Sequence, residues 1–132
     1  MNKFLKILLF AVFLIVSGVI YQKFYRPQSV GPVQASGRVV EVNVRARKDQ
    51  WKWDPAEIKV KAGDRVILKI FNEDEYDHGW ALEFFGINRR MFPQRETVVD
   101  FIASKAGIFQ FYCSVPCGEG HYDQLGALIV EE

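Results

Sequence analysis

The feature that most constrains the fold is a series of short alternating segments that begins near residue 38. In VVEVNV, residues 39–44, valines alternate with Glu41 and Asn43, so one face of the segment is apolar. Similar segments follow along the chain: EIKVK, RVILKIF, GWALEF, ETVVDFI, GIFQFYC and LGALIV. About seven short strands with turn residues between them predict an antiparallel sandwich or barrel. No long stretch of helical periodicity follows residue 26, so the sequence predicts an all-β domain.

An apolar run near the N-terminus predicts a membrane signal. Residues 7–20, ILLFAVFLIVSGVI, are apolar or small, and Lys3 and Lys6 precede them. Apolar neighbours extend the run toward the roughly 20 residues that span a bilayer. We favour an uncleaved single-pass anchor over residues 1–26, because no A-x-A cleavage site follows directly; a cleaved signal peptide is the alternative. Both interpretations place the following chain on the periplasmic or extracytoplasmic side of the cell membrane.

The rest of the chain divides into a linker and one domain. Residues 27–37, PQSVGPVQASG, predict a linker, since Pro, Gly and Ser disfavour regular structure. Residues 38–132 form the predicted folded domain. The whole chain has 49% hydrophobic residues, a composition that argues against a disordered protein. The net charge of +1 argues against a nucleic-acid-binding protein. Residues 27–132 alone carry thirteen basic against sixteen acidic side chains, a balance of −3 that suits a basic partner.

Every cysteine and histidine of the chain can be placed in one candidate metal site. The segment CSVPCGEGH, residues 113–121, contains Cys113, Cys117 and His121, each four positions after the last. His78 lies 35 residues before Cys113. If the strands pair as a sandwich, the loops at one end cluster, and His78 can join the other three residues there.

The residues themselves leave three interpretations of this site open. An exported protein allows a Cys113–Cys117 disulfide, but a disulfide leaves both histidines unexplained. A tetrahedral zinc site with two Cys and two His is the second interpretation, although structural zinc usually serves folds that lack a core. Copper is the third, because thiolate and imidazole suit it as donors and a sandwich loop can impose an unusual geometry.

The segment CSVPCGEGH resembles the binding loop of CuA, the dinuclear copper centre of oxidase subunit II and of nitrous-oxide reductase. The family pattern is Cys, three residues, Cys, Gly, two residues, His, two residues, Met, and the chain matches it through His121. Four further segments are similar to cupredoxin or subunit II segments: IKVKAGDRV, AGIFQFYC, DHGW at 77–80 and QWKW at 50–53. The resemblance covers most of residues 38–132 and implies a cupredoxin-like Greek-key sandwich.

The resemblance implies a role for each matching residue. The sulfurs of Cys113 and Cys117 would bridge two copper ions. His78 and His121 would each bind one copper through a ring nitrogen, and the backbone carbonyl of Val115 would be a weak ligand.

Three further positions carry expectations. Gln124 stands where the family has its axial Met, so its side chain either coordinates copper or leaves that place empty. Val115 replaces the acidic residue that many oxidase subunits have between the cysteines. Trp51, in QWKW, is expected either to be the residue through which electrons enter or to be only a packing or surface residue, whereas Trp53 is expected in the core.

The implied function is that of a membrane-anchored electron-transfer subunit. It would take electrons from a c-type cytochrome or similar donor and pass them to catalytic subunit I of a haem–copper oxidase, and it would not be catalytic alone. The alternative is a free-standing anchored copper protein, either an electron carrier to another complex or a copper chaperone or sensor. Sco-type chaperones use a helix-rich fold that this chain does not show. The sequence argues against a hydrolase, because no histidine is left over to act as a base.

Two charged stretches complete the sequence-based expectations. NEDEYD, residues 72–77, places acidic side chains next to His78, and we expect either a docking patch for a basic cytochrome or a solvated loop. The second charged stretch is expected to lie in an exposed loop and to have no role in the site; it contains Arg89, Arg90, Met91 and Arg95.

Overall fold

The computed structural model of the protein describes residues 2–25 and 35–132, which belong to two separate units. The first unit contains the helix α1, Lys3–Phe24, which begins after Asn2, whose side chain accepts a hydrogen bond from the Phe4 N–H. In the described part of the chain, α1 alone is long and apolar enough to cross a membrane. Its apolar side chains are exposed all round, as expected of a helix that faces lipid. The predicted linker over residues 27–37 lies mostly outside the described residues.

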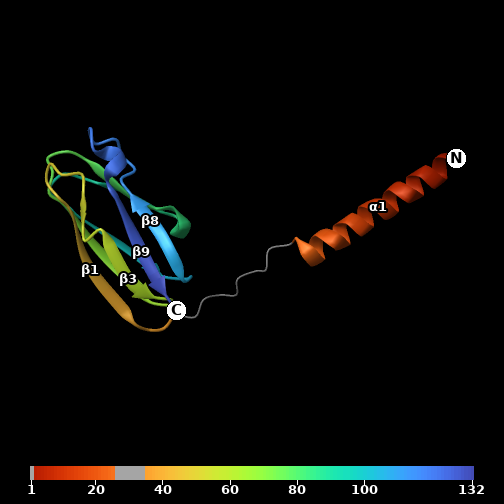
Figure 1. The fold of residues 1–132 in the computed structure, drawn as a ribbon, viewed down its shortest axis with the longest axis horizontal. Coiled ribbons are helices and arrows are strands. Elements are labelled where there is room, and N and C mark those ends of the chain that lie inside the picture. The colour runs from red at the N-terminus through yellow and green to blue at the C-terminus, as the bar shows by residue number, and fades with distance from the viewer. Residues whose placement is uncertain (1, 26–34) are drawn as a thin grey trace. The chain divides into compact units, whose positions relative to one another are not determined.

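The second unit is a sandwich of two sheets (Figure 1). One sheet has the strand order β2-β1-β4-β7, with the bounds Trp53–Asp54, Val39–Ala46, Arg65–Asn72 and Glu96–Ile102. The other has the order β3-β9-β8-β5-β6, with the bounds Glu57–Lys61, Leu125–Glu131, Gly107–Tyr112, His78–Leu82 and Ile87–Met91. The strand pairs β1/β4 and β3/β9 are parallel and the remaining pairs are antiparallel. The predicted all-β sandwich is therefore confirmed, but the expectation of antiparallel pairing is wrong for β1/β4 and β3/β9.

A second correction concerns the stretch that contains Arg89, Arg90 and Met91. Arg89, Arg90 and Met91, expected in an exposed loop, belong to strand β6, and Met91 lies opposite His78 in the β5/β6 register. Arg95 lies exposed between β6 and β7, as expected. Met91 is fully buried in the core, whereas the two arginines before it are exposed. Three consecutive polar residues lie between the buried Ile87 and Met91, so this edge strand lacks the alternation that marks the others.

The core fills the space between the two sheets. It consists mainly of inward-facing residues of both sheets: Val44, Val66, Leu68, Ile70, Trp80, Phe111, Leu128 and Val130. Each large apolar side chain buried in this way stabilises the fold by roughly 1.5–3 kcal/mol. Trp53, expected in the core, is only 3% exposed, and its indole N–H donates to the Gln124 carbonyl oxygen. The core thus extends to the end of the sandwich where β1, β4 and β8 end and β5 and β9 begin.

Several loops gather at this end of the sandwich. They are the segments 47–52, 73–77 and 113–124, and the last contains the short 3-10 helix η2, His121–Asp123. A second 3-10 helix, η1, Glu83–Phe85, follows β5. The C-terminus lies at the opposite end of the sandwich from η2 (Figure 1). The segments that carry the predicted site residues therefore meet at one end, as the sandwich prediction required.

Candidate metal centre

His78 is the first residue of β5, a strand buried along its whole length. Its ring is fully buried and has a partner on each nitrogen. Nδ1 lies 3.6 Å from the sulfur of Cys113, and Nε2 lies 2.8 Å from the carboxylate oxygen Oδ2 of Asp74. The ring is therefore fixed on both sides, with Nδ1 turned toward the cysteines.

The loop after β8 supplies the other three predicted ligands. Cys113 follows the last residue of β8, and its N–H donates to the Gln124 carbonyl oxygen at 3.1 Å, which closes the loop. The sulfurs of Cys113 and Cys117 lie 3.5 Å apart as free thiols, and Cys117 Sγ lies 3.6 Å from Nδ1 of His121. The donor atoms thus form a row: His78 Nδ1, Cys113 Sγ, Cys117 Sγ and His121 Nδ1.

Two oxygen atoms flank this row of four donors. The Val115 carbonyl oxygen lies 3.2 Å from the Cys113 sulfur, and Oε1 of Gln124 lies 3.5 Å from the Cys117 sulfur. Gln124 is fully buried, and its Nε2 has no hydrogen-bond partner in the described part of the chain. Such an unpaired buried amide is costly. The donor types and the inward-turned Gln124 side chain fit a metal centre at this position.

The four main donors are not equally close to one another. The ligand atoms of His78, Cys113 and Cys117 all lie within 4.8 Å of each other. His121 lies outside this group of three and contacts only its outer sulfur, that of Cys117. His78 and both cysteines are buried, whereas His121 is half-buried. The site is therefore elongated, with one closed end at His78 and one end nearer the surface at His121.

The acid–base properties of the cysteines follow from their contact. Burial raises the pKa of both thiols. For Cys113 the hydrogen bonds with His78 and the Gly79 N–H outweigh burial and lower the pKa, whereas the neighbouring Cys113 raises the pKa of Cys117 further. The contact therefore favours ionisation of Cys113 over ionisation of Cys117, and a metal cation would stabilise both thiolates.

The pKa of His78 reflects two opposing influences. Burial disfavours the charged ring, but the hydrogen bonds with Cys113 and Asp74 outweigh burial and raise the pKa above its ordinary value. Both partners favour a ring that carries positive charge.

Gly79 allows β5 to approach the loop after β8, residues 113–124, which we call the metal loop. A Cβ atom at this position would lie 2.2 Å from Ser114 Oγ and 2.8 Å from the Val115 backbone nitrogen. The Gly79 N–H also donates to the Cys113 sulfur at 3.4 Å. Sequence reasoning did not identify Gly79 as a site residue, although it lies directly after His78 in the DHGW segment.

Trp51 packs against the metal loop and is half-buried, in agreement with the packing alternative. Its indole Nε1 donates to the Cys117 carbonyl oxygen at 3.0 Å. A Cβ atom at Gly118 would lie 3.0 Å from the indole ring, and one at Gly120 would lie 2.6 Å from it. Trp51 has a φ of 48°, a conformation that costs free energy for a bulky residue and persists only when its surroundings impose it.

The acidic stretch before His78 is not simply a solvated loop. Asp74 is buried beneath the surface, and Glu73 accepts hydrogen bonds from the Lys48 N–H at 3.2 Å and from Arg45 at 3.0 Å. Asp77 pairs with Arg90. Most of these carboxylates are bound to neighbouring groups of the domain, and Glu75 is the exposed one among them. A docking patch for a basic cytochrome at this stretch stays a prediction.

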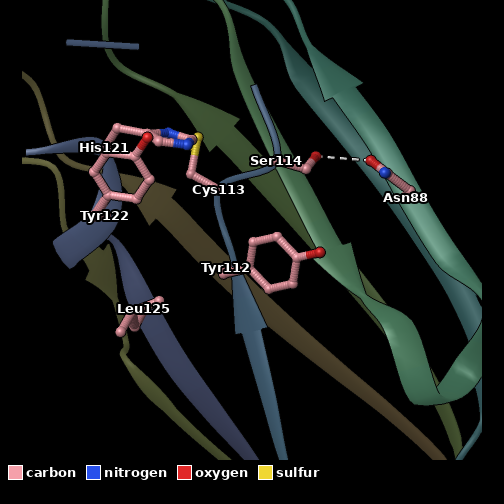
Figure 2. A pocket seen from close by; sticks show the side chains of 7 residues that line it. All are labelled: Asn88, Tyr112, Cys113, Ser114, His121, Tyr122 and Leu125. Carbon is pink, nitrogen blue, oxygen red and sulfur yellow. Dashed lines mark hydrogen bonds between the residues drawn. The ribbon is translucent and has the colours of Figure 1, made fainter. Parts of the chain in front are cut away.

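A hollow of about 340 Å³ connects the site to the surface. Its lining residues are Asn88, Tyr112, Cys113, Ser114, His121, Tyr122 and Leu125. Figure 2 shows His121, Tyr122 and Leu125 on one side of the hollow and Ser114, bonded to Asn88, on the other. Tyr122 is 85% exposed. The His121 end of the site is thus the end that another molecule can approach.

Comparison with known proteins identifies the family. The profile of a family described as a cupredoxin-like domain matches residues 7–130. The chain belongs to the cupredoxin-like family. This assignment confirms the predicted Greek-key cupredoxin-like sandwich and agrees with copper as the metal of the site.

Three similar proteins place this cupredoxin-like chain more narrowly. It is 35% identical over 94 residues to nitrous-oxide reductase of Ralstonia nicotianae, covering 69% of the chain and 15% of that protein. It is 29% identical over 80 residues to cytochrome c oxidase subunit 2 of Thermus thermophilus, covering 61% of the chain and 58% of that protein. The periplasmic domain of cytochrome oxidase subunit II of Bradyrhizobium japonicum has the same fold, with a TM-score of 0.61 and 23% identity over 70% of the chain and 84% of that domain.

These matches confirm the resemblance to the copper domains of oxidase subunit II and nitrous-oxide reductase. The chain spans 15% of the length of the reductase and 58% of that of the oxidase subunit. The relation therefore concerns the cupredoxin-like domain, and the activities of the complete relatives are not transferred with it.

Proposed function

We propose that this protein is a membrane-anchored electron-transfer subunit that carries a dinuclear CuA copper centre. It would receive electrons from a c-type cytochrome or similar donor and pass them to the catalytic subunit of a haem–copper oxidase. The similarity to cytochrome c oxidase subunit 2 supports this partner. The observation that carries the proposal is the row of four donor atoms that ends in His78 and His121.

The elongated shape of the site favours two metal ions over one. In a tetrahedral zinc site, bonds of about 2.3 Å or less keep every pair of donors within about 3.8 Å. Here His121 lies outside the group of ligand atoms that are within 4.8 Å of one another. Two thiolates in the middle of a row, with an imidazole at each end, match two metals that share both sulfurs.

Each residue of the row then has a defined task. Cys113 and Cys117 would bridge the two copper ions, while His78 and His121 would each bind one of them. The Val115 carbonyl oxygen and the Gln124 side chain would be weaker ligands at opposite ends. Bound copper would supply a one-electron redox couple, which needs no substrate pocket. The buried ligands are held by the sandwich core, so their positions would change little when the charge of the site changes.

Electrons would reach the site from the exposed side. His121 borders the hollow beside Tyr122, which gives a donor close access to a ligand (Figure 2). Trp51 is a second candidate for this role, because its ring packs directly on the segment after Cys117. Both histidines serve as ligands in this proposal, so the chain would not be catalytic by itself.

Copper titration of the purified protein tests this proposal. We expect two copper ions per chain, a purple colour and an electron paramagnetic resonance signal of one unpaired electron shared by two coppers. A saturating stoichiometry of one copper, or a colourless product, would refute the dinuclear centre.

The proposed location follows from the helix α1. We propose that α1, Lys3–Phe24, anchors the chain in the cell membrane as a single span, with the cupredoxin-like domain on the periplasmic or extracytoplasmic side. Mass spectrometry of the protein from membranes tests whether this segment is retained. A mature chain that starts near Ser36 would instead identify a cleaved signal peptide.

One observation favours a second candidate, a free-standing anchored copper protein that is an electron carrier to another complex, a chaperone or a sensor. Val115 places an aliphatic side chain where many oxidase subunits have an acidic residue. Isolation of the protein from membranes in mild detergent distinguishes the two. An oxidase subunit should co-purify with a haem-containing partner, whereas a free-standing protein should be isolated alone with its copper.

A further inference from the structure

We propose that Asp74 is a positioning residue of the metal centre, holding the His78 ring with one carboxylate oxygen and the turn that carries Trp51 with the other. This inference rests on the proposed function for its effect on copper, but its structural part concerns only residues of this chain. Asp74 would thereby connect the ligand His78 with Trp51, which contacts the part of the metal loop that follows Cys117.

The first contact of Asp74 is with the ligand ring. Oδ2 of Asp74 lies 2.8 Å from Nε2 of His78, and both side chains are almost completely buried. A carboxylate at this position requires the ring proton on Nε2, which leaves Nδ1 free to face Cys113 and the metal. A carboxylate bonded to a ligand histidine also makes the ring a stronger donor.

The second contact of Asp74 is with the turn after β1. Oδ1 of Asp74 accepts a hydrogen bond from the Asp49 N–H at 2.8 Å. Asp49 has a φ of 56° and Trp51 one of 48°, so this turn contains two residues in the left-handed region that need outside support. Two residues after Asp49, Trp51 donates to the Cys117 carbonyl oxygen and fills the space left by Gly118 and Gly120.

The charge of Asp74 makes a purely structural role unsatisfactory. Asp74 is 1% exposed, and a buried carboxylate is costly unless a positive group compensates it. Within the described ranges, no lysine or arginine forms an ion pair with Asp74, and His78 is its ionisable partner. A protonated His78 ring compensates this carboxylate in the metal-free protein, and a metal cation on Nδ1 would take over that compensation when it replaces the Nδ1 proton, so the buried carboxylate suits a ligand of a cation.

Other residues hold Asp74 itself in place. The Asp74 N–H donates to Oδ1 of Asn72 at 3.0 Å, and Nδ2 of Asn72 donates to the Tyr76 carbonyl oxygen at 2.8 Å. Nε2 of Gln94 reaches the Asp74 carbonyl oxygen at 3.3 Å. The backbone of Asp74 is thus fixed independently of its carboxylate, so a side-chain substitution tests the carboxylate contacts themselves.

The test compares Asp74→Ala, Asp74→Asn and the control Glu75→Gln in the full-length chain in detergent micelles. Glu75 is the exposed neighbour of Asp74, so its substitution removes the same charge without touching His78. We expect Asp74→Ala to lower copper affinity about ten- to a hundredfold and to raise the reduction potential, because the His78 ring becomes a weaker donor. Asp74→Asn keeps one acceptor oxygen and should give a smaller loss of affinity, while Glu75→Gln should match the wild type.

A metal-free measurement separates this inference from the proposed function. In nuclear magnetic resonance spectra of the metal-free chain, the His78 Nε2 proton, the Asp49 N–H and the Trp51 indole N–H should exchange slowly with solvent. Asp74→Ala should speed all three exchanges at least tenfold, and Asp74→Asn, which keeps one acceptor, should protect at least one of them. Unchanged exchange in the variants would overturn the role of Asp74, whatever metal the site binds. If Asp74→Ala does not fold, the comparison of Asp74→Asn with Glu75→Gln decides by the same measurements.

Discussion

At the residue scale, Gln124 is the position where this chain departs most clearly from the CuA pattern. Its amide is fully buried, with Oε1 turned toward the Cys117 sulfur. An amide oxygen is a harder donor than a thioether, so it should stabilise the oxidised copper relative to the reduced one. In the proposed copper centre this side chain would tune the reduction potential without supplying a main ligand.

Replacement of Gln124 by Met should raise the reduction potential and leave the copper count unchanged. We expect a shift of up to about 60 mV, which is a tenfold change in the equilibrium constant of a one-electron couple. The shift should be limited because two thiolates and two imidazoles dominate the bonding. Voltammetry of the two proteins measures it, and an equal or lower potential in the Met variant would remove Gln124 from the tuning residues.

Trp51 combines two roles that a single truncation would mix. Its ring fills the space beside Gly118 and Gly120, and its indole N–H bonds to the Cys117 carbonyl oxygen. Trp51→Ala would remove both contacts and expose the metal loop, so slower electron transfer in that variant could reflect a disordered loop.

Trp51→Phe separates the two roles. The Phe ring still covers the glycines, and only the indole hydrogen bond is lost, which should cost about 1 kcal/mol of loop stability. We expect an unchanged copper spectrum in the Phe variant and a weakened, altered one in the Ala variant. If the Phe variant keeps its spectrum but accepts electrons from a reduced cytochrome more slowly, Trp51 conducts electrons. Equal rates would leave it with loop support alone.

At the scale of elements, the sequence predicts strands where one face is apolar. The segments ETVVDFI and EIKVK coincide with β7 and β3, because alternating side chains there face core and solvent in turn. Strand β2 was not among the seven predicted segments, since its two residues are too short for a pattern, and β6 was not predicted because polar residues fill its middle. Edge strands of this kind are defined by the neighbour with which they pair, which single-sequence patterns do not show.

The sequence predicted the ligands of the candidate site but not the residues that support them. The spacing of Cys113, Cys117 and His121 indicated the site, because ligands in one loop are close in sequence as well as in space. The roles of Asp74 and Gly79 could not be predicted, since burial of a carboxylate and close approach of two backbones depend on strands that pair across the sheet. The sequence shows an acidic residue near His78 but does not show that this residue is buried.

The contact between β5 and the metal loop gives a prediction at this scale. Gly79→Ala would place a Cβ atom 2.8 Å from the Val115 backbone nitrogen and 2.9 Å from that of Ser114, so the loop must move. We expect the variant to fold, with a melting temperature lowered by about 5 °C, and to bind copper at least tenfold more weakly.

Copper titration and thermal unfolding of the metal-free protein check this prediction. Gly86→Ala in the turn after η1 is the control, because a Cβ there meets no atom within 4 Å although its φ of 66° also strains alanine. The control should lose stability and keep its copper affinity. Unchanged affinity in Gly79→Ala would show that the loop adapts freely.

At the scale of the whole molecule, the two ends of the sandwich serve different purposes. One end holds the candidate metal centre, and the other receives the segment that enters the domain before β1. There the Asp64 carboxylate, 1% exposed, accepts hydrogen bonds from Arg38, from Ser36 at 3.2 Å and from the Lys61 N–H at 2.7 Å. The Ser36 N–H also donates to the Gly63 carbonyl oxygen at 2.8 Å. This cluster holds the start of the domain in place without touching any of the proposed ligands.

The Asp64 cluster should make the stability of the domain depend on pH in a defined way. The hydrogen bond with Arg38 lowers the pKa of Asp64 well below its usual value, although burial opposes this shift. A carboxyl whose pKa is lower in the folded protein stabilises the fold above its unfolded pKa of about 3.9, and this contribution disappears as the pH falls further. Asp64→Asn should therefore lower the melting temperature of the metal-free protein by about 5 °C at pH 7, and by less at pH 3.

Thermal unfolding followed by circular dichroism between pH 7 and pH 3 measures this difference. Asp100→Asn is the matched control, because Asp100 pairs with Arg65 on the surface, where both side chains are largely exposed and such pairs contribute little. Both variants should bind copper with the wild-type spectrum at pH 7, since neither residue lies at the metal end of the sandwich. A melting-temperature difference between Asp64→Asn and wild type that stays constant over the whole pH range would contradict the ionised Asp64 cluster. A changed copper spectrum in Asp64→Asn would show instead that the two ends of the sandwich are coupled.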